Sequence, residues 1–406
     1  MVINLENGLI RKTFYAVLGL FLASSMFSIA IEQATFALAL ILWLITILTG
    51  GREKPRRTVL DIPLAAFVLA SLVAVLLSDD PPGSLSAMRN YLMIPVIYLI
   101  GFSVRSMNKA RRFGVLLLIA AAASAVSGIV IYLMNTGGGG LNRTPGTFSM
   151  PLTFGGVMML SCSLFFAITL TGGIRRSAAA VCGAGTLLTA AALFLSFTRS
   201  SWLGMFISGI VIIIILRKKL IIPFILLLVL FILLLPAEQR GRVTSIWDPD
   251  YPSNRERIEL MKGGWDIFLE NSIIGVGPGD LAREYERHMP RGAEVIYGHM
   301  HNTFLHIAVT RGIIGLLTFL WFVVAVYRLL TGTLRIDLPP PENGWAVGSL
   351  GAFTGFLVNG LFEWNFGDAE VITVLYIIIG SNIALRTAGY FIGKGRRKDF
   401  FTDNLS

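Results

Sequence analysis

The four histidines of this 406-residue chain lie close together, at His288, His299, His301 and His306. Imidazole titrates near neutral pH, so one of them could act as a general base. A metal site is an alternative, and it would use His299, His301 and His306 with a carboxylate such as Glu294. The spacing fits no standard zinc pattern and no cysteine lies nearby, so we expect no metal. A third interpretation is structural, with the ring nitrogens satisfied at a membrane interface.

Arginines form the second group of residues that could do chemistry. Arg199 lies in FTRSSW between two apolar runs, and Arg143 lies in GLNRTPGTF. A long polar segment further along the chain adds seven more arginines: Arg240, Arg242, Arg255, Arg257, Arg283, Arg287 and Arg291. A charge near a bilayer boundary is costly to desolvate, so it usually has a partner or a function. Guanidinium groups bind phosphate in a bidentate fork. These residues therefore predict a site for a lipid-linked phosphate or diphosphate, with snorkelling and loop solvation as the alternative.

Two other features could suggest a binding or reactive site, but both are better explained as structural. The stretch GVGPGD (275–280) lacks the Lys and Ser/Thr of a phosphate-binding loop and does not continue as a dinucleotide motif, so it predicts a rigid turn. Cys162 and Cys182 both lie in apolar runs without polar company, which indicates membrane packing.

The elements that must position these residues are helices in a membrane. Apolar residues make up 54% of the chain and charged residues 14%, which excludes a soluble protein. Many apolar runs are long enough to cross about 30 Å of hydrocarbon. The sequence therefore predicts an all-α integral membrane protein of one domain, residues 1–406. The twelve expected helices span residues 13–31, 33–49, 59–77, 87–104, 113–134, 152–171, 178–197, 202–216, 220–236, 302–329, 345–362 and 370–387.

Basic residues set the expected orientation of these helices. Connections and helix ends on one side, together with the two chain ends, carry 22 of the 34 Lys and Arg residues. Short connections on the other side carry few, and they include the acidic pieces 78–82 and 362–370. The positive-inside rule places both termini in the cytoplasm. The net charge of +10 is thus a topology signal that favours contact with membrane lipids and gives no support for nucleic-acid binding.

One connection is long enough to be a functional unit. Residues 237–301, here called the outer loop, lie between the ninth and tenth expected helices and are predicted to lie on the outer side of the membrane. Apolar residues at helical spacing predict a helix over 254–270, and Asp280 could begin a second one that ends at Met289. We expect this loop to carry the catalytic face.

These residues resemble a known family. In HNTFLHIAVTRGIIG (301–315), His301 and Asn302 are followed at fixed spacing by Gly312 and Gly315. This is similar to the histidine motif of bacterial O-antigen ligases, in the superfamily that also contains O-antigen polymerases. Three further stretches resemble superfamily signatures in the same order: RTPGTFSMPLTFGG (143–156), LSFTRSSWLG (195–204) and NRERIELMKGGW (254–265).

The resemblance implies an inverting, metal-independent glycosyltransferase of GT-C-like architecture in the bacterial inner membrane, with no cofactor and an active site on the periplasmic side. The implied donor is a glycan on undecaprenyl diphosphate, and the implied acceptor is a sugar hydroxyl of lipid A–core oligosaccharide. His301 matches the general base. Arg199, Arg257 and, less closely, Arg143 match residues that bind the donor diphosphate.

Two other functions stay open. An O-antigen polymerase would use the same donor but add it to another undecaprenyl-linked glycan. A twelve-helix transporter is the alternative outside enzymes, yet such transporters often have their long linker between helices six and seven. Here that connection is short, and few ionisable residues lie in the middle of helices, where coupling sites need them.

Overall fold

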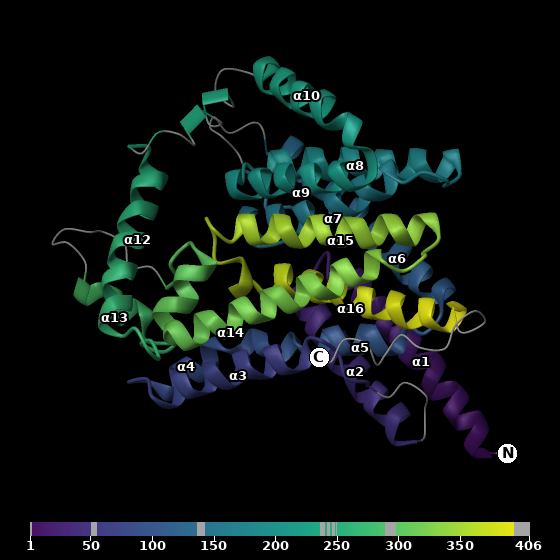
Figure 1. Ribbon diagram of the computed structural model, residues 1–406, viewed down its shortest axis with the longest axis horizontal. Helices are drawn as coiled ribbons and strands as arrows, with labels where there is room; N and C mark the ends of the chain where they lie inside the picture. The colour runs from purple at the N-terminus through teal and green to yellow at the C-terminus, as the bar shows by residue number, and fades with distance from the viewer. Residues whose placement is uncertain are drawn as a thin grey trace.

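The computed structural model describes residues 2–49, 55–135, 143–235, 240–241, 244–245, 248, 250–288 and 298–393, which form helices joined by short connections (Figure 1). Six of the described helices are long and apolar enough to cross a membrane, or seven if a bent pair counts as one span. Helices suit this composition because hydrocarbon offers backbone groups no hydrogen-bond partner. The structure agrees with an all-α membrane protein, while the count of twelve spans and the side of each terminus stay predictions.

Each expected apolar segment overlaps at least one helix in the part of the chain that the structure describes, although α1 ends at Ser24 and not at residue 31. Eleven long helices correspond to eleven of those segments: α1 (Val2–Ser24), α2 (Ile29–Leu48), α3 (Asp61–Leu76), α6 (Met107–Met134), α7 (Pro151–Leu170), α8 (Arg176–Leu195), α9 (Arg199–Arg217), α10 (Ile221–Leu234), α14 (Thr303–Leu334), α15 (Pro340–Asn359) and α16 (Ala369–Gly393).

The remaining segment, expected as one helix over 87–104, is broken into shorter pieces. They are α4 (Pro81–Ala87), the 3-10 helix η1 (Arg89–Met93) and α5 (Pro95–Ser103), and the first is bent by 41° from the rest. The bend lies between Ala87 and Arg89. Pro95 has no N–H to donate, which suits the first turn of a helix, and α5 begins there after η1. The expectation of one continuous helix over 87–104 was therefore wrong, because a 3-10 helix precedes α5 within it.

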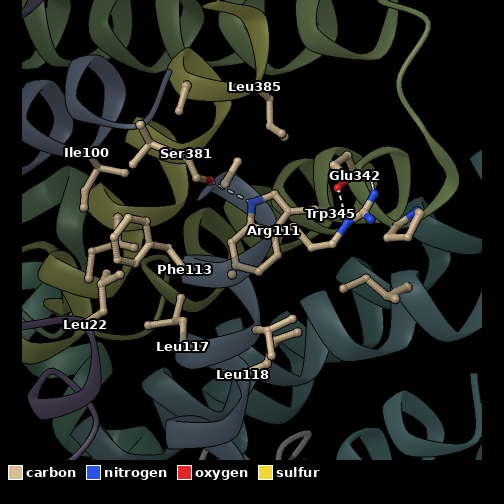
Figure 2. A pocket seen from close by; sticks show the side chains of 18 residues that line it. Leu22, Ile100, Arg111, Phe113, Leu117, Leu118, Glu342, Trp345, Ser381 and Leu385 are labelled. Atoms are coloured by element: carbon tan, nitrogen blue, oxygen red, sulfur yellow. Dashed lines mark hydrogen bonds and ion pairs between the residues drawn. The ribbon is translucent and has the colours of Figure 1, made fainter. Parts of the chain in front are cut away.

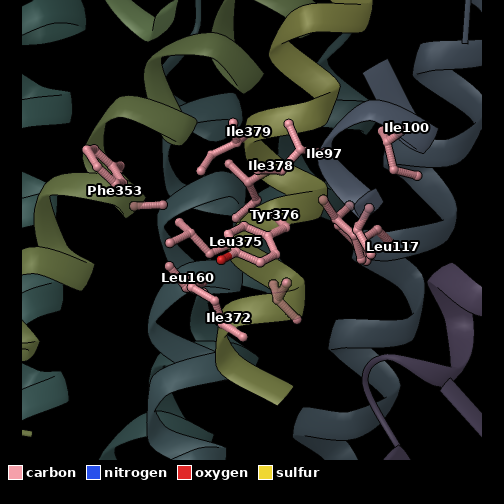
Figure 3. Packing of buried hydrophobic residues seen from close by; sticks show 14 of the residues in the cluster. Ile97, Ile100, Leu117, Leu160, Phe353, Ile372, Leu375, Tyr376, Ile378 and Ile379 are labelled. Atoms are coloured by element: carbon pink, nitrogen blue, oxygen red, sulfur yellow. The ribbon is translucent and has the colours of Figure 1, made fainter. Parts of the chain in front are cut away.

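The centre of the bundle is formed by α7 and α16. In their most apolar windows, 83% of α7 and 89% of α16 is buried, against 22% of α8 at the edge. Figure 3 shows Tyr376 of α16 among aliphatic side chains from α5, α6 and α7. Close approach of α9 and α15 depends on small residues, because a Cβ on Gly355 would lie 2.6 Å from the Gly204 carbonyl oxygen. This packed frame fixes the helix ends that carry the polar residues.

Two outer-loop helices lie across one end of the bundle (Figure 1, left). They are α12 (Pro252–Glu270) and α13 (Leu281–His288), in agreement with the two helices predicted for this loop. Leu260 and Ile267 of α12 pack with Leu281 and Tyr285 of α13 in a small apolar cluster. The outer loop therefore has its own hydrophobic anchor on the bundle end.

The outer loop meets α14 at a break in that helix. Gly312 has φ 63°, and a Cβ there would lie 2.2 Å from the backbone of Ile273. The outer loop hydrogen-bonds to the backbone of α14 just before this break, since the Val276 N–H donates to the Val309 carbonyl at 3.0 Å. A residue with a side chain would be strained at this position and would clash. Gly312 of the histidine motif is therefore a docking point for the outer loop.

The predicted turn at 275–280 has the conformation expected of it. Gly275 and Gly277 have φ of 80° and 90°. Asp280 is buried, and its Oδ2 accepts a hydrogen bond of 2.9 Å from the backbone N–H of Asp80. The turn thus fastens the outer loop to the start of α4.

An apolar pocket of about 80 Å³ lies between α5, α6, α15 and α16, at the end of the bundle away from the histidines (Figure 2). Arg111 donates to Glu342 at 2.7 and 3.0 Å beside it, and Trp345 donates to Ser381 at 2.7 Å. The remaining lining is almost wholly apolar, which does not suit a phosphate or a sugar. We therefore place the candidate site elsewhere.

Candidate active site

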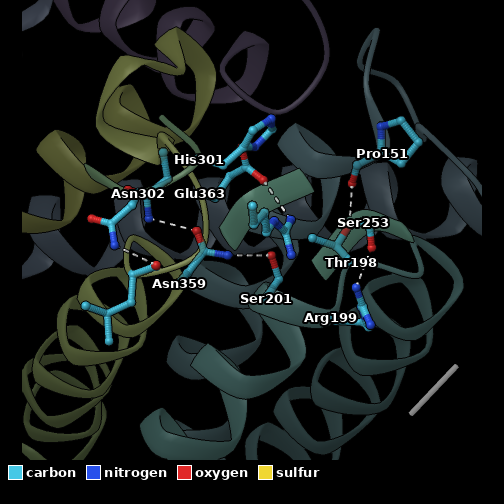
Figure 4. A network of polar contacts seen from close by, with 12 residues as sticks. Pro151, Thr198, Arg199, Ser201, Ser253, His301, Asn302, Asn359 and Glu363 are labelled. Atoms are coloured by element: carbon cyan, nitrogen blue, oxygen red, sulfur yellow. Dashed lines mark hydrogen bonds and ion pairs between the residues drawn. The ribbon is translucent and has the colours of Figure 1, made fainter. Parts of the chain in front are cut away.

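The candidate site lies where α14 begins, beside the connection from α15 to α16 and the start of α9 (Figure 4). Its central contact joins His301 to Glu363, with 2.8 Å between Nδ1 and Oε1. The two side chains are 18% and 12% exposed, so solvent reaches them but does not surround them. If Nδ1–H donates to the carboxylate, Nε2 is the basic nitrogen of the ring. This arrangement can orient a general base.

Glu363 is held in its ionised form by its neighbours. Burial alone would raise its pKa, but the hydrogen bond from His301 and the nearby charges of His301 and Arg257 outweigh burial, and its pKa is lowered. Arg257, on α12, places Nη2 at 3.6 Å from Oε2 of Glu363. A histidine, a carboxylate and an arginine therefore come together from three separate parts of the chain.

Asn302, which follows His301 in the motif, uses both ends of its side-chain amide to hold the start of α14. Its Oδ1 accepts from the Leu305 N–H at 2.9 Å and caps α14, while its Nδ2 donates to the Leu361 carbonyl at 2.9 Å. Thr303 adds a donation to the Glu363 carbonyl at 3.0 Å. These bonds fix the start of α14 to the segment that carries Glu363, so the His301–Glu363 contact is held on both sides.

Backbone strain is concentrated at this site. Among the described residues, Phe197 and His301 are the two non-glycine residues with positive φ, at 50° and 42°. Phe197 lies two residues before Arg199, and His301 is the residue expected to act as the base. Such conformations cost of order 1–3 kcal/mol each and occur often at functional sites. The fold thus maintains two unfavourable conformations at the positions where it presents these side chains.

Arg199 begins α9 and holds the start of α12. Its Nη1 donates to Ser245 at 2.9 Å, and its Nη2 donates to Ser253 at 2.7 Å and to Asn254 at 2.9 Å. Its guanidinium carbon lies 5.2 Å from the centre of the Tyr251 ring. These contacts fix the direction of the Arg199 guanidinium at the start of α9.

Arg143 contacts the residues just before Arg199. It donates to the Ser196 carbonyl at 3.1 Å and to the Thr198 hydroxyl at 3.3 Å, and Thr198 donates to the Pro151 carbonyl at 3.0 Å. Arg143 therefore braces the strained turn that precedes Arg199.

A buried polar chain joins the connection from α15 to α16, which carries Glu363, to α9, which begins at Arg199. Asn365 donates to Asn359 at 2.8 Å, and Asn359 donates to Ser201 at 3.0 Å. Figure 4 shows His301 and Glu363 on one side of Ser201 and Asn359, with Arg199 and Ser253 on the other. The segments that carry Glu363 and Arg199 are therefore joined through Asn359 and Ser201.

The other histidines differ in their surroundings. His306 is 4% exposed, with its ring centre 3.8 Å from that of Trp364, which is a packing position. His288 contacts Glu270 at 3.0 Å, away from His301. His299 lies next to His301, with the ring centres 4.2 Å apart.

The residues that could bind a metal in the structure differ from those that the sequence suggested. Glu294 lies outside the described residues, and His306 is packed in α14 against Trp364. Instead, one ligand atom each from His299, His301 and Glu363 lie within 4.8 Å of one another.

Sequence reasoning missed Glu363. The segment FEWNFGDAE was noted as an acidic piece on the outer side, but nothing in it singled out one carboxylate. The available signal was a carboxylate directly after an apolar helix, on the same predicted side as the histidines. Gly315 was included as part of the motif, and a Cβ there would lie 2.2 Å from the Arg311 Cβ, so its role is close packing.

Comparison with known families agrees with the resemblance. Residues 184–320, about a third of the chain, match the family described as O-antigen ligase. No protein of curated function matches the chain. The matched stretch includes Arg199, Arg257 and His301, whereas Arg143 and Glu363 lie outside it. The chain therefore carries a domain of the O-antigen ligase/polymerase superfamily on a helical membrane fold, and this type of domain belongs to glycosyltransferase-like enzymes.

Proposed function

We propose that this protein is an O-antigen ligase, which transfers a glycan from undecaprenyl diphosphate to a sugar hydroxyl of lipid A–core oligosaccharide. The observation that carries the proposal is the His301–Glu363 contact of 2.8 Å with Arg257 beside it, in a chain that matches the O-antigen ligase family. We place the reaction on the periplasmic side of the inner membrane, in line with the distribution of basic residues.

His301 is the general base in this proposal. A sugar hydroxyl has a pKa far above 7, so a positioned base must remove its proton as the oxygen attacks. The proton passes to Nε2 of His301, and Glu363 stabilises the imidazolium that forms. The acceptor oxygen bonds to the anomeric carbon as the bond from that carbon to the diphosphate oxygen breaks. Attack from the opposite face inverts the configuration.

Arginines stabilise the leaving group. Undecaprenyl diphosphate takes the electron pair of the broken bond, and its developing charge needs donors that are already oriented. Arg257 and Arg199 supply these donors, with Arg143 supporting the turn before Arg199. Guanidinium groups can hold this charge without a metal ion, and the diphosphate bond already stores the driving force, so the proposal needs no cofactor.

Transfer with purified components tests this function. His301→Ala should lower the rate by about 10²–10⁴-fold, the usual contribution of a positioned base, while donor binding stays intact. His288→Ala is the matched control and should transfer normally, because His288 lies apart from the site. Near-normal transfer by His301→Ala would refute the assignment.

Gene deletion separates ligase from polymerase. Loss of a ligase leaves lipid A–core without polymer while undecaprenyl-linked polymer accumulates. Loss of a polymerase abolishes the polymer itself. Neither change would point to a transporter or to another substrate.

A further inference from the structure

His299 has an unusual position beside the proposed base. Its Nδ1 is buried and has no hydrogen-bond partner among the described residues, and the same holds for Oε2 of Glu363. Ligand atoms from these two residues and from His301 lie within 4.8 Å of one another. Two imidazoles and one carboxylate form a set that Zn²⁺ binds, with the fourth position open.

We propose that His299, His301 and Glu363 bind a divalent transition-metal ion such as Zn²⁺, and that the bound ion inhibits the enzyme. Zinc–ligand bonds of about 2.0–2.1 Å put tetrahedral ligand atoms roughly 3.3 Å apart, so modest side-chain movement closes the site. The ion would use the lone pair of His301 and the carboxylate of Glu363, and both are then lost to proton transfer.

Arg257 makes this site an inhibitory one. Its guanidinium lies 3.6 Å from Glu363 and opposes a second cation there. The side chain is 25% exposed and has room to turn away when a metal binds. Competition with Arg257 makes binding reversible, which suits an inhibitor better than a resident cofactor. Mg²⁺ and Ca²⁺ prefer oxygen ligands and should not occupy the site.

Binding is measured on the full-length protein in nanodiscs, by competition with a chromogenic zinc indicator and by the visible absorption of added Co²⁺. The wild type should bind one ion through this site, and Mg²⁺ should not displace it. His299→Ala should weaken Zn²⁺ binding at least tenfold, since even indirect supports of a metal site are worth about 10–100-fold. His299→Gln serves if the alanine variant folds poorly. His288→Ala is the matched control and should bind as the wild type does.

Inhibition is a separate readout that rests on the proposed function. Zn²⁺ should inhibit transfer by the wild type, and His299→Ala should transfer normally without metal but need at least about tenfold more Zn²⁺ for half inhibition. Equal binding or inhibition in the wild type and both His299 variants would overturn the proposal, as would loss of binding in His288→Ala instead. If the wild type transfers no glycan, the proposed function fails, while the binding measurement still decides the metal site.

Discussion

Replacing Glu363 with Gln is the sharpest test of the candidate site. The substitution keeps the shape of the side chain but removes the negative charge next to His301. The Gln amide can also donate to Nδ1, which would put the proton on Nε2 and leave the ring unable to act as a base there. We therefore expect a large loss of kcat with little change in donor binding.

The size of the effect follows from the geometry. With 2.8 Å between Nδ1 and Oε1, the charge centres of carboxylate and imidazolium lie about 4 Å apart, which is worth about 4 kcal/mol at an effective dielectric of about 20. Arg257 at 3.6 Å from the other oxygen offsets part of this. A remaining contribution of about 3 kcal/mol corresponds to a rate loss of roughly 10²-fold.

The assay is single-turnover transfer with undecaprenyl-diphosphate-linked glycan and lipid A–core in nanodiscs. Glu270→Gln is the matched control, because Glu270 forms a similar contact of 3.0 Å with His288 outside the site. That variant should keep wild-type rates. A Glu363→Gln protein that is folded, binds donor and transfers within threefold of the wild type would refute the role of the carboxylate.

Further predictions concern the arginine of α9, the break in α14, the topology and pH. Arg199→Lys should impair donor use strongly and Arg199→Ala should abolish it, because a lysine lacks the bidentate fork; normal donor binding by the alanine variant would contradict this. Gly312→Ala should cost about 1–3 kcal/mol or more, seen as a lower thermal midpoint, because φ is 63° there. A cysteine at Lys262 should react with an impermeant thiol reagent in spheroplasts and one at Arg57 should not, with the reverse result inverting the topology. The pKa of His288 is raised, first by its hydrogen bond to the Glu284 carbonyl and then by the Glu270 carboxylate, so NMR should show His288 titrating above 6.5. The protonated ring then stabilises the fold fully below pH 6.5, and this contribution is lost as the pH rises through the pKa of the folded protein.

The sequence alone determined the fold class and one half of the site. Long apolar runs had to become helices, because unpaired backbone groups are too costly in hydrocarbon. The histidine motif pointed to His301, Asn302 and Gly312 through local spacing, and local roles explain two of them: Asn302 caps α14, and Gly312 adopts a positive φ. The break before α5 was not anticipated from the sequence, because the apolar run continues through Pro95.

Tertiary packing alone decided which residues work together. Glu363 lies far from His301 in the chain, and nothing near it in sequence shows that it would contact that ring at 2.8 Å. The contact exists because the α15–α16 connection and the start of α14 are fastened to each other at one end of the bundle. The family resemblance pointed to Arg257, but its contact with Glu363 at 3.6 Å arises only because α12 folds across that end. Local sequence patterns specify the helices, whereas contacts between side chains that are distant in the sequence depend on how the whole bundle packs.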